Sequence, residues 1–121
     1  MDVWYNPSCS KCRAAAQRLD VAGVGYRLRR YLDQPPTAAE LDDVLQRLGQ
    51  QPWEIARLGE PVAKELGLHH WPRDEGSRQR WIDAMVDHPK LIQRPILLLD
   101  DGRALVGRTP EALDEAVKGS A

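Results

Sequence analysis

The chain has 121 residues, of which 42% are hydrophobic, 29% are charged and two are cysteines, and its formal net charge is −1. This length is typical of one domain that buries a core without disulfide bonds. A net charge so close to zero produces no strong electrostatic field that would attract nucleic acid or an anionic membrane. No apolar run is long enough for a membrane span, and Met1-Asp2 leads directly into the first apolar run, so neither an anchor nor a signal peptide is expected. Two cysteines without a leader favour a reducing compartment. The expectation is a cytoplasmic monomer without a nucleic-acid or membrane partner.

The first third of the chain has the pattern of a strand, a helix and a second strand. Residues 3–5 are apolar and predict the first strand, and the alanine-rich run that follows predicts a helix over about 10–20. Gly23 and Gly25 interrupt the pattern, and residues 26–31 begin as an alternating polar and apolar run, which predicts a second strand. A strand–helix–strand unit of this length implies parallel strands joined by a right-handed crossover.

The middle of the chain, residues 37–88, predicts a block of helices. Thr37 and Glu40 fit a capping box, apolar residues follow at helical spacing, and Gly49 ends the first helix. Two further helices begin with a proline in the first turn, and a fourth ends before His88-Pro89. The predicted helices span about 37–49, 52–57, 60–66 and 74–87.

The last third predicts a hairpin and a final helix. Residues 96–99 form a continuous apolar run, as in a buried central strand. Asp100-Asp101-Gly102 is a turn signal, and residues 104–106 predict the returning strand. Thr109-Pro110-Glu111 then has the N-cap, proline and acidic residue that begin a helix.

The order of these elements predicts an α/β fold. It is a thioredoxin-like mixed sheet of about four strands, with a helical insertion between strands two and three. We expect a single domain over residues 1–121 with the insertion at 37–88.

Both cysteines lie where the first strand gives way to the first helix. Cys9 faces the free N–H groups and the positive end of the helix dipole, which stabilise a thiolate. Cys12 follows one turn later on the same helix face, so the two thiols can close a disulfide with little backbone movement. Asn6 is expected to hold the loop before Cys9, whereas Arg13 either assists near Cys9 or is the first exposed charge of the helix.

The alternatives for this C-x-x-C pair are half of a zinc site or two unrelated buried thiols. Zinc usually needs a second pair of ligands at short spacing, and His69-His70 is the only candidate pair in the sequence. The strand–loop–helix setting favours redox or nucleophilic thiol chemistry, so no metal site is expected.

Short stretches spread over nearly the whole chain resemble a known family. They are Asn6-Pro7-Ser8-Cys9, Tyr31-Leu32-Asp33-Gln34-Pro35-Pro36-Thr37, Arg57 with Glu60-Pro61, Glu65-Leu66-Gly67-Leu68, His88-Pro89, Arg94-Pro95-Ile96 and Arg108-Thr109-Pro110-Glu111. In these the chain resembles the arsenate reductase family of thioredoxin/glutaredoxin-like fold, which also includes the Spx-type regulators.

This resemblance implies a set of site residues. Cys9 would be the nucleophile, and Arg57, Arg94 and Arg108 would bind the anion. Pro95 would follow a cis peptide bond that faces the cysteine. The glutaredoxin-dependent enzymes of the family typically have no cysteine at the position of Cys12, so the second thiol is either Cys12 or an external one.

The chemistry of these residues suits arsenate, a tetrahedral oxyanion. Arginine forks and a helix N-terminus bind such an anion, a cysteine thiolate attacks arsenic, and a second thiol attacks the sulfur so that arsenite leaves. The expected function is a thiol-dependent arsenate reductase. We expect no bound cofactor but an external reductant, which would be glutathione with glutaredoxin, mycothiol or a thioredoxin system.

Two other functions remain open at this point. A Spx-like regulator would use the C-x-x-C pair as a redox switch and bind RNA polymerase, although the resemblance implies that this branch lacks an arginine at the position of Arg108. A general thiol–disulfide reductase would use Cys9 and the same arginines on a carboxylate-bearing thiol of the glutathione type.

Overall fold

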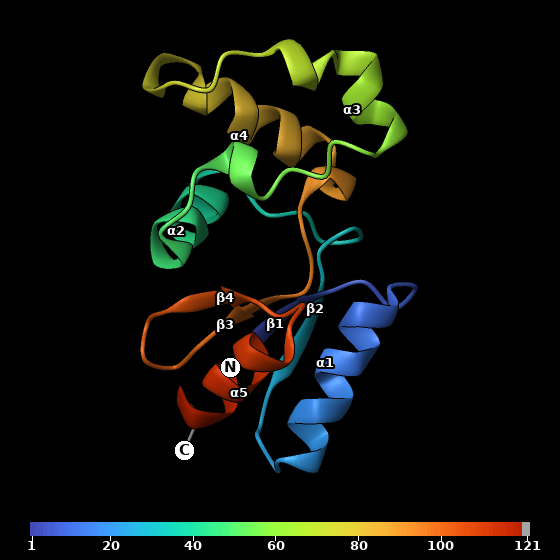
Figure 1. The fold of residues 1–121 in the computed structure, drawn as a ribbon, viewed down its shortest axis with the longest axis vertical. Coiled ribbons are helices and arrows are strands. Elements are labelled where there is room, and N and C mark those ends of the chain that lie inside the picture. Colours follow the sequence, from blue (N-terminus) through green and yellow to red (C-terminus); the bar gives the residue numbers. More distant parts are fainter. Residues whose placement is uncertain (120–121) are drawn as a thin grey trace. The chain divides into compact units, whose positions relative to one another are not determined.

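The computed structural model describes residues 1–119, and these form two compact units (Figure 1). The first unit contains Met1–Gln34 and the chain from Arg94 onward, and the second contains Pro35–Gln93. The second unit includes the predicted helical block. That the two units form a single domain stays a prediction.

A mixed sheet of four strands is the centre of the first unit. The strand order is β2-β1-β3-β4, with β1 and β2 parallel and the other neighbours antiparallel. The strands are β1 (Asp2–Tyr5), β2 (Arg27–Arg30), β3 (Ile96–Leu98) and β4 (Ala104–Val106). This sheet confirms the predicted fold class, with the parallel pair and the hairpin where the sequence pattern put them.

Two helices, α1 (Ser10–Val21) and α5 (Pro110–Gly119), lie on the same side of this sheet (Figure 1). Their apolar side chains meet those of the central strands in one buried cluster. The buried members of that cluster are Val3, Leu19, Leu97, Leu99 and Ala116. Because side chains alternate along a strand, Val3 joins this cluster while its neighbour Trp4 is buried on the other face of the sheet.

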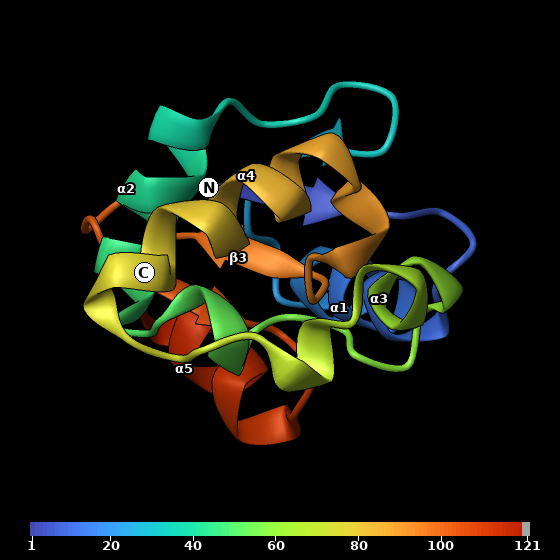
Figure 2. The same cartoon turned by 90° about the horizontal axis from the view of Figure 1, so that it is seen from above.

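The second unit is helical, and in it α2 (Ala38–Leu48) and α4 (Arg78–Asp87) pack side by side (Figure 2). The third helix is α3 (Pro61–Leu66). Trp81 of α4 is fully buried, and the rings of Trp53 and Trp71 meet it edge to face at centroid distances of 6.2 and 5.5 Å. The remaining helical segments are single 3-10 turns at Pro52–Glu54, Leu68–His70, Glu75–Ser77 and Pro89–Leu91.

The predicted helix over 52–57 is wrong beyond its first turn. The chain leaves the 3-10 turn at Ile55, whose carbonyl oxygen accepts a hydrogen bond from the Gln93 N–H at 3.0 Å. The Arg57 N–H in turn donates to the Leu91 carbonyl oxygen at 2.8 Å. These backbone bonds with a distant segment replace the helical ones, so tertiary pairing overrides the local helix signal.

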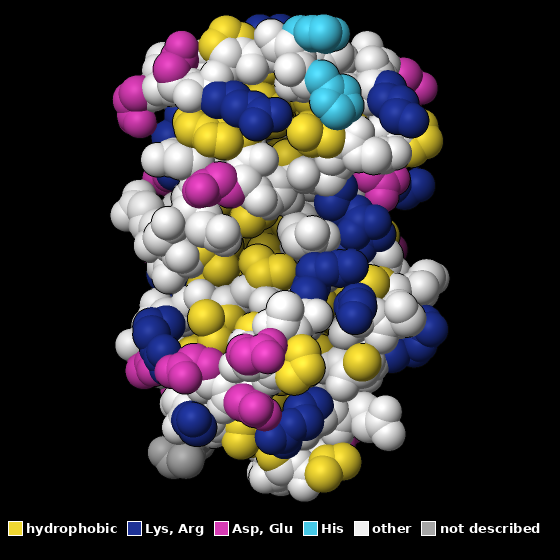
Figure 3. All heavy atoms as spheres, in the orientation of Figure 1, with side chains coloured by type: hydrophobic (Ala, Val, Ile, Leu, Met, Phe, Trp, Pro, Cys, Tyr) yellow, Lys and Arg dark blue, Asp and Glu magenta, His cyan; other side chains and the backbone are white. Residues whose placement is uncertain are grey.

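Charged side chains of both signs are intermixed on the surface, as Figure 3 shows for one face. In the first unit Arg18 pairs with Asp114 at 3.1 Å, and Arg103 pairs with Asp101 and Glu115 at 2.9 and 2.8 Å. Exposed pairs of this kind add little stability. Among the described residues, no helix is long and apolar enough to cross a membrane.

The predicted capping box is present at the start of α2. The Thr37 hydroxyl accepts a hydrogen bond from the Glu40 N–H, and the Glu40 carboxylate accepts one from the Thr37 N–H. We expect Thr37→Ala to lower the free energy of unfolding by about 1 kcal/mol, because an N-cap acceptor is lost. Urea unfolding followed by circular dichroism measures this. Thr37→Ser is the control, since it keeps the hydroxyl, and equal losses in both variants would mean that the cap contributes nothing.

Candidate functional site

The loop that carries Cys9 is fixed by hydrogen bonds at each of its residues. The Cys9 N–H donates to the Asn6 carbonyl oxygen at 3.0 Å, and the Ser8 N–H donates to the Asn6 side-chain oxygen at 3.0 Å. Arg13, on α1, donates to the Pro7 carbonyl oxygen at 2.9 Å. Asn6 is buried. Asn6 and Arg13 therefore hold this loop between them, although a part in catalysis stays a prediction for both.

Cys9 is the N-cap residue of α1 and is partly exposed. Its backbone is extended, and its sulfur makes no capping hydrogen bond of standard geometry, yet the N–H groups of the first helical turn lie around it. Burial raises the pKa of this thiol. Four neighbouring groups outweigh burial and lower the pKa to about 7, namely the Cys12 N–H, the Cys12 thiol, the Lys11 N–H and the Arg94 side chain. A large fraction of Cys9 is therefore thiolate at neutral pH.

Cys12 has the opposite properties. It is 0% exposed, and burial is the largest cause that raises the pKa of its thiol to about 11. A backbone hydrogen bond from Asn6 and the charge of Arg94 lower this pKa, whereas the hydrogen bond and the charge of Cys9 raise it further. Both cysteines are free thiols, and they are in side-chain contact with each other. The pair therefore contains one acidic, accessible thiol and one protonated, buried thiol.

Arg94 reaches the cysteine pair because of the strand register. β1 and β3 are antiparallel, and Trp4 near the end of β1 lies opposite Ile96 at the start of β3. The loop after β1 therefore lies next to Arg94-Pro95, the residues before β3. Arg94 is only 9% exposed, and its side chain is near enough to Cys9 to help lower the pKa of that thiol.

Pro95 and Arg108 lie beside Arg94. The peptide bond between Arg94 and Pro95 is cis, as the resemblance implies. Arg108 follows β4, and its guanidinium donates to the Arg94 carbonyl oxygen at 2.8 Å. The structure thus brings together Cys9, Cys12, Arg94 and, through the main chain of Arg94, Arg108.

Arg57, the third predicted anion-binding arginine, belongs to the second unit. There its guanidinium pairs with Glu60 at 3.2 Å and donates to the Gln93 side-chain oxygen at 3.0 Å. These residues line a hollow of about 490 Å³ together with Ala56, Leu58 and Gly59. Glu60 is near Arg57 in the sequence, three residues further on, but Gln93 is near it only because segments 55–57 and 91–93 pair. A role of Arg57 in substrate binding stays a prediction.

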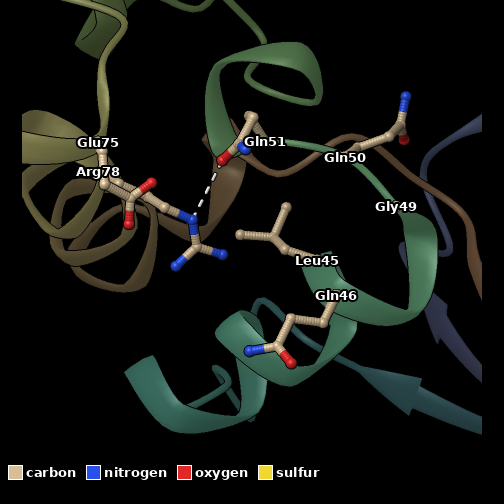
Figure 4. Close-up of a pocket in the computed structure, with 7 residues that line it drawn as sticks. All are labelled: Leu45, Gln46, Gly49, Gln50, Gln51, Glu75 and Arg78. Carbon is tan, nitrogen blue, oxygen red and sulfur yellow. Dashed lines mark hydrogen bonds between the residues drawn. The ribbon is translucent and has the colours of Figure 1, made fainter.

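A different hollow, of about 380 Å³, lies within the second unit and contains no predicted site residue (Figure 4). Its lining consists of Leu45, Gln46, Gly49, Gln50, Gln51, Glu75 and Arg78. The Arg78 guanidinium donates to the Gln51 side-chain oxygen at 3.1 Å and pairs with Asp42. Residues 1–119 contain no group of three or more His, Cys, Asp or Glu side chains that could hold a metal ion.

The fold and the site define a thioredoxin-like protein with an acidic cysteine at the N-terminus of its first helix. The chain belongs to the ArsC family, whose model matches residues 4–116. The matched residues include the cysteine pair, β2, β3 and β4, and the end of β1.

Similar proteins support this assignment. The chain is 54% identical to an uncharacterised protein in the glnII region of Streptomyces viridochromogenes, over 97% of this chain and 98% of that one. It is 38% identical to an arsenate reductase of Neisseria meningitidis, over 93% of both chains. Among solved structures, an arsenate reductase from Vibrio cholerae has a TM-score of 0.84 and 34% identity, over 96% of this chain and 98% of that one.

The pKa of Cys9 generates a prediction for its reactivity. Alkylation by iodoacetamide should be half-maximal near pH 7 and should fall about tenfold for each pH unit below that, because the thiolate is the nucleophile. Peptide mapping after labelling over a range of pH separates Cys9 from Cys12. Cys9→Ser is the control and should remove nearly all labelling at neutral pH. Preferential labelling of Cys12, or a midpoint near the ordinary value of 9.0, would contradict the assignment.

Proposed function

We propose that this protein is a thiol-dependent arsenate reductase in which Cys9 is the nucleophile and Cys12 the resolving thiol. The observation that carries the proposal is the cluster of an acidic Cys9, a buried Cys12 and the Arg94 side chain at the N-terminus of α1. Family membership and the arsenate reductases among the similar proteins support arsenate as the substrate.

Arsenate binding would use the donors that already stabilise the Cys9 thiolate. The first turn of α1 presents backbone N–H groups and the positive end of a 12-residue helix, which suit a tetrahedral oxyanion. Arg94 adds a planar, permanently charged fork that can pair with two oxygens at once. That Arg57 and Arg108 are further ligands of the anion stays a prediction from the resemblance.

The first chemical step would be attack of the Cys9 thiolate on arsenic. A sulfur–arsenic bond forms, an arsenic–oxygen bond breaks, and the departing oxygen takes up protons and leaves as water. The electrostatic contribution of Arg94 and the helix end is greatest where negative charge gathers on the arsenate oxygens. Arsenic is still in the +5 state after this step.

The second step would be attack of Cys12 on the Cys9 sulfur. A disulfide forms, the sulfur–arsenic bond breaks, and its electron pair passes to arsenic, which leaves as arsenite in the +3 state. Two of the causes that keep Cys12 protonated are the hydrogen bond and the charge of Cys9. Both change once the Cys9 sulfur is bonded to arsenic, so the Cys12 pKa would fall at the step that needs its thiolate. An external thiol would then reduce the disulfide and return both cysteines to the free form.

The test of this proposal is arsenate-dependent release of arsenite. Wild-type protein is supplied in turn with glutathione and glutaredoxin, with mycothiol, and with a thioredoxin system, and arsenite is measured. Turnover with at least one donor is expected, together with its loss in Cys9→Ser. No arsenite with any donor would exclude the reductase and favour the redox-switch regulator. Reduction of glutathione mixed disulfides without any arsenate turnover would favour the general thiol–disulfide reductase.

Replacement of Arg94 should impair turnover far more than folding. Each charge-assisted hydrogen bond contributes about 1.5–3 kcal/mol, so Arg94→Ala should lower arsenate turnover by about one to two orders of magnitude. Arg94→Lys should recover only part of this, because lysine is a point charge without a fork. Turnover rates and melting temperatures of both variants provide the measurement.

Arg18→Ala is the matched control for Arg94, since Arg18 is a surface arginine paired with Asp114 in the same unit. It should leave turnover unchanged. An Arg94→Ala enzyme as active as this control would mean that the oxyanion is bound elsewhere.

A further inference from the structure

The turn after β4 holds the two residues that precede β3. The Gly107 N–H donates to the Pro95 carbonyl oxygen at 2.9 Å, and the Arg108 guanidinium donates to the Arg94 carbonyl oxygen at 2.8 Å. Consecutive carbonyl groups at Arg94 and Pro95 are thus bound by consecutive residues at the end of the neighbouring strand. The register explains this, because Val106 at the end of β4 lies opposite Ile96 at the start of β3.

The Gly107 side of this contact is closely packed. A Cβ atom at Gly107 would lie 3.0 Å from a methyl carbon of Leu97 and 3.3 Å from one of Leu113. The turn therefore sits tightly against β3 and α5, with little room to shift. Arg108 extends from this fixed turn, and its side chain is partly buried where it meets Arg94.

We propose that Arg108 is a positioning residue for the reactive thiol, which fixes the main chain of Arg94 and thereby keeps the Arg94 side chain against Cys9. This inference rests on the proposed function only in taking Cys9 as the reactive thiol. It does not depend on arsenate being the substrate. It gives Arg108 a role besides that of the oxyanion ligand that the family resemblance implies, since the bond to the Arg94 carbonyl oxygen leaves the other guanidinium N–H donors for an anion.

The contacts of the two arginines distinguish the roles. The register of β1 and β3 places Arg94 beside the loop that carries Cys9, and Arg94 lowers the pKa of both Cys9 and Cys12. The groups among the described residues that lower the pKa of Cys9 are Lys11, Cys12 and Arg94. Arg108 instead donates a hydrogen bond from one guanidinium nitrogen to the main-chain oxygen of Arg94. Its effect on the thiol would therefore pass through Arg94.

These two roles need different chemistry at position 108. An oxyanion ligand benefits from the planar fork of arginine, which lysine lacks. A positioning residue that binds one carbonyl oxygen needs a single donor of sufficient length, which lysine has. Lysine should therefore restore the properties of Cys9 under the positioning account, but only part of the anion affinity under the ligand account.

The experiment measures the ionisation of Cys9 without any arsenate present. The alkylation rate of Cys9 by iodoacetamide is followed as a function of pH, with peptide mapping to exclude Cys12, and the midpoint is determined. The variants are Arg108→Met, which keeps the length and loses the donors, and Arg108→Lys, with Arg94→Met as the reference for full loss. Arg103→Met is the matched control, since Arg103 lies on the same hairpin and pairs with Asp101 and Glu115. The midpoint is used instead of the rate at one pH, because the nucleophilicity of a thiolate itself changes with its pKa.

The expected result is a higher midpoint in Arg108→Met, by up to about half a pH unit, which lowers the thiolate fraction at pH 7 by up to about twofold. Arg94→Met should shift the midpoint in the same direction and at least as far, and Arg108→Lys and Arg103→Met should match wild type. An unchanged midpoint in Arg108→Met overturns the proposal, as does a shift that lysine fails to restore. If Arg108→Met does not fold, Arg108→Gln replaces it with the same expected direction. If the alkylation midpoints shift as expected but the protein shows no arsenate turnover, this inference holds and only the proposed substrate is rejected.

Discussion

The balance of interactions at the Cys9 sulfur is the constraint on which the rest of the site depends. Burial opposes ionisation of this thiol, whereas the helical N–H groups, the neighbouring thiol and Arg94 favour it, and the net result is a pKa of about 7. Cys12, one turn further into α1, also lies near Arg94 but is fully buried, and its pKa rises to about 11. Two identical side chains thus acquire different pKa values because one lies at the helix end and the other inside it.

The sheet provides the geometry for this balance. β3 is central, with β1 on one side and β4 on the other, and both neighbours run antiparallel to it. The loops that follow β1 and β4 therefore both lie beside the residues that precede β3. Cys9 comes from the first loop, Arg108 from the second, and Arg94 stands between them, so three distant parts of the sequence meet at one end of the sheet.

Local signals in the sequence were enough to predict the elements of the first unit. The strands and the helix after Cys9 depend on nearest neighbours or on simple periodicity, and the structure confirms them, as it does the capping box at Thr37 in the second unit. The segment 52–57 could not be predicted in the same way, because its backbone pairs with residues 91–93. The contact of Arg108 with the Arg94 carbonyl and that of Arg57 with Gln93 also depend on pairing between distant segments. The family resemblance points to Arg57, Arg94 and Arg108, but not to the contact of the Arg108 guanidinium with the main chain of Arg94.

The most direct measurement of the central claim is a single turnover of the fully reduced protein with arsenate and no external thiol. If Cys9 attacks arsenic and Cys12 resolves it, each chain should release about one arsenite and lose two thiols. Mass spectrometry should then show a monomer two protons lighter, with a peptide map that joins Cys9 to Cys12. Release of arsenite only after an external thiol is added, with both cysteines still unlinked, would contradict the intramolecular mechanism. Absence of arsenite under both conditions would contradict the reductase itself.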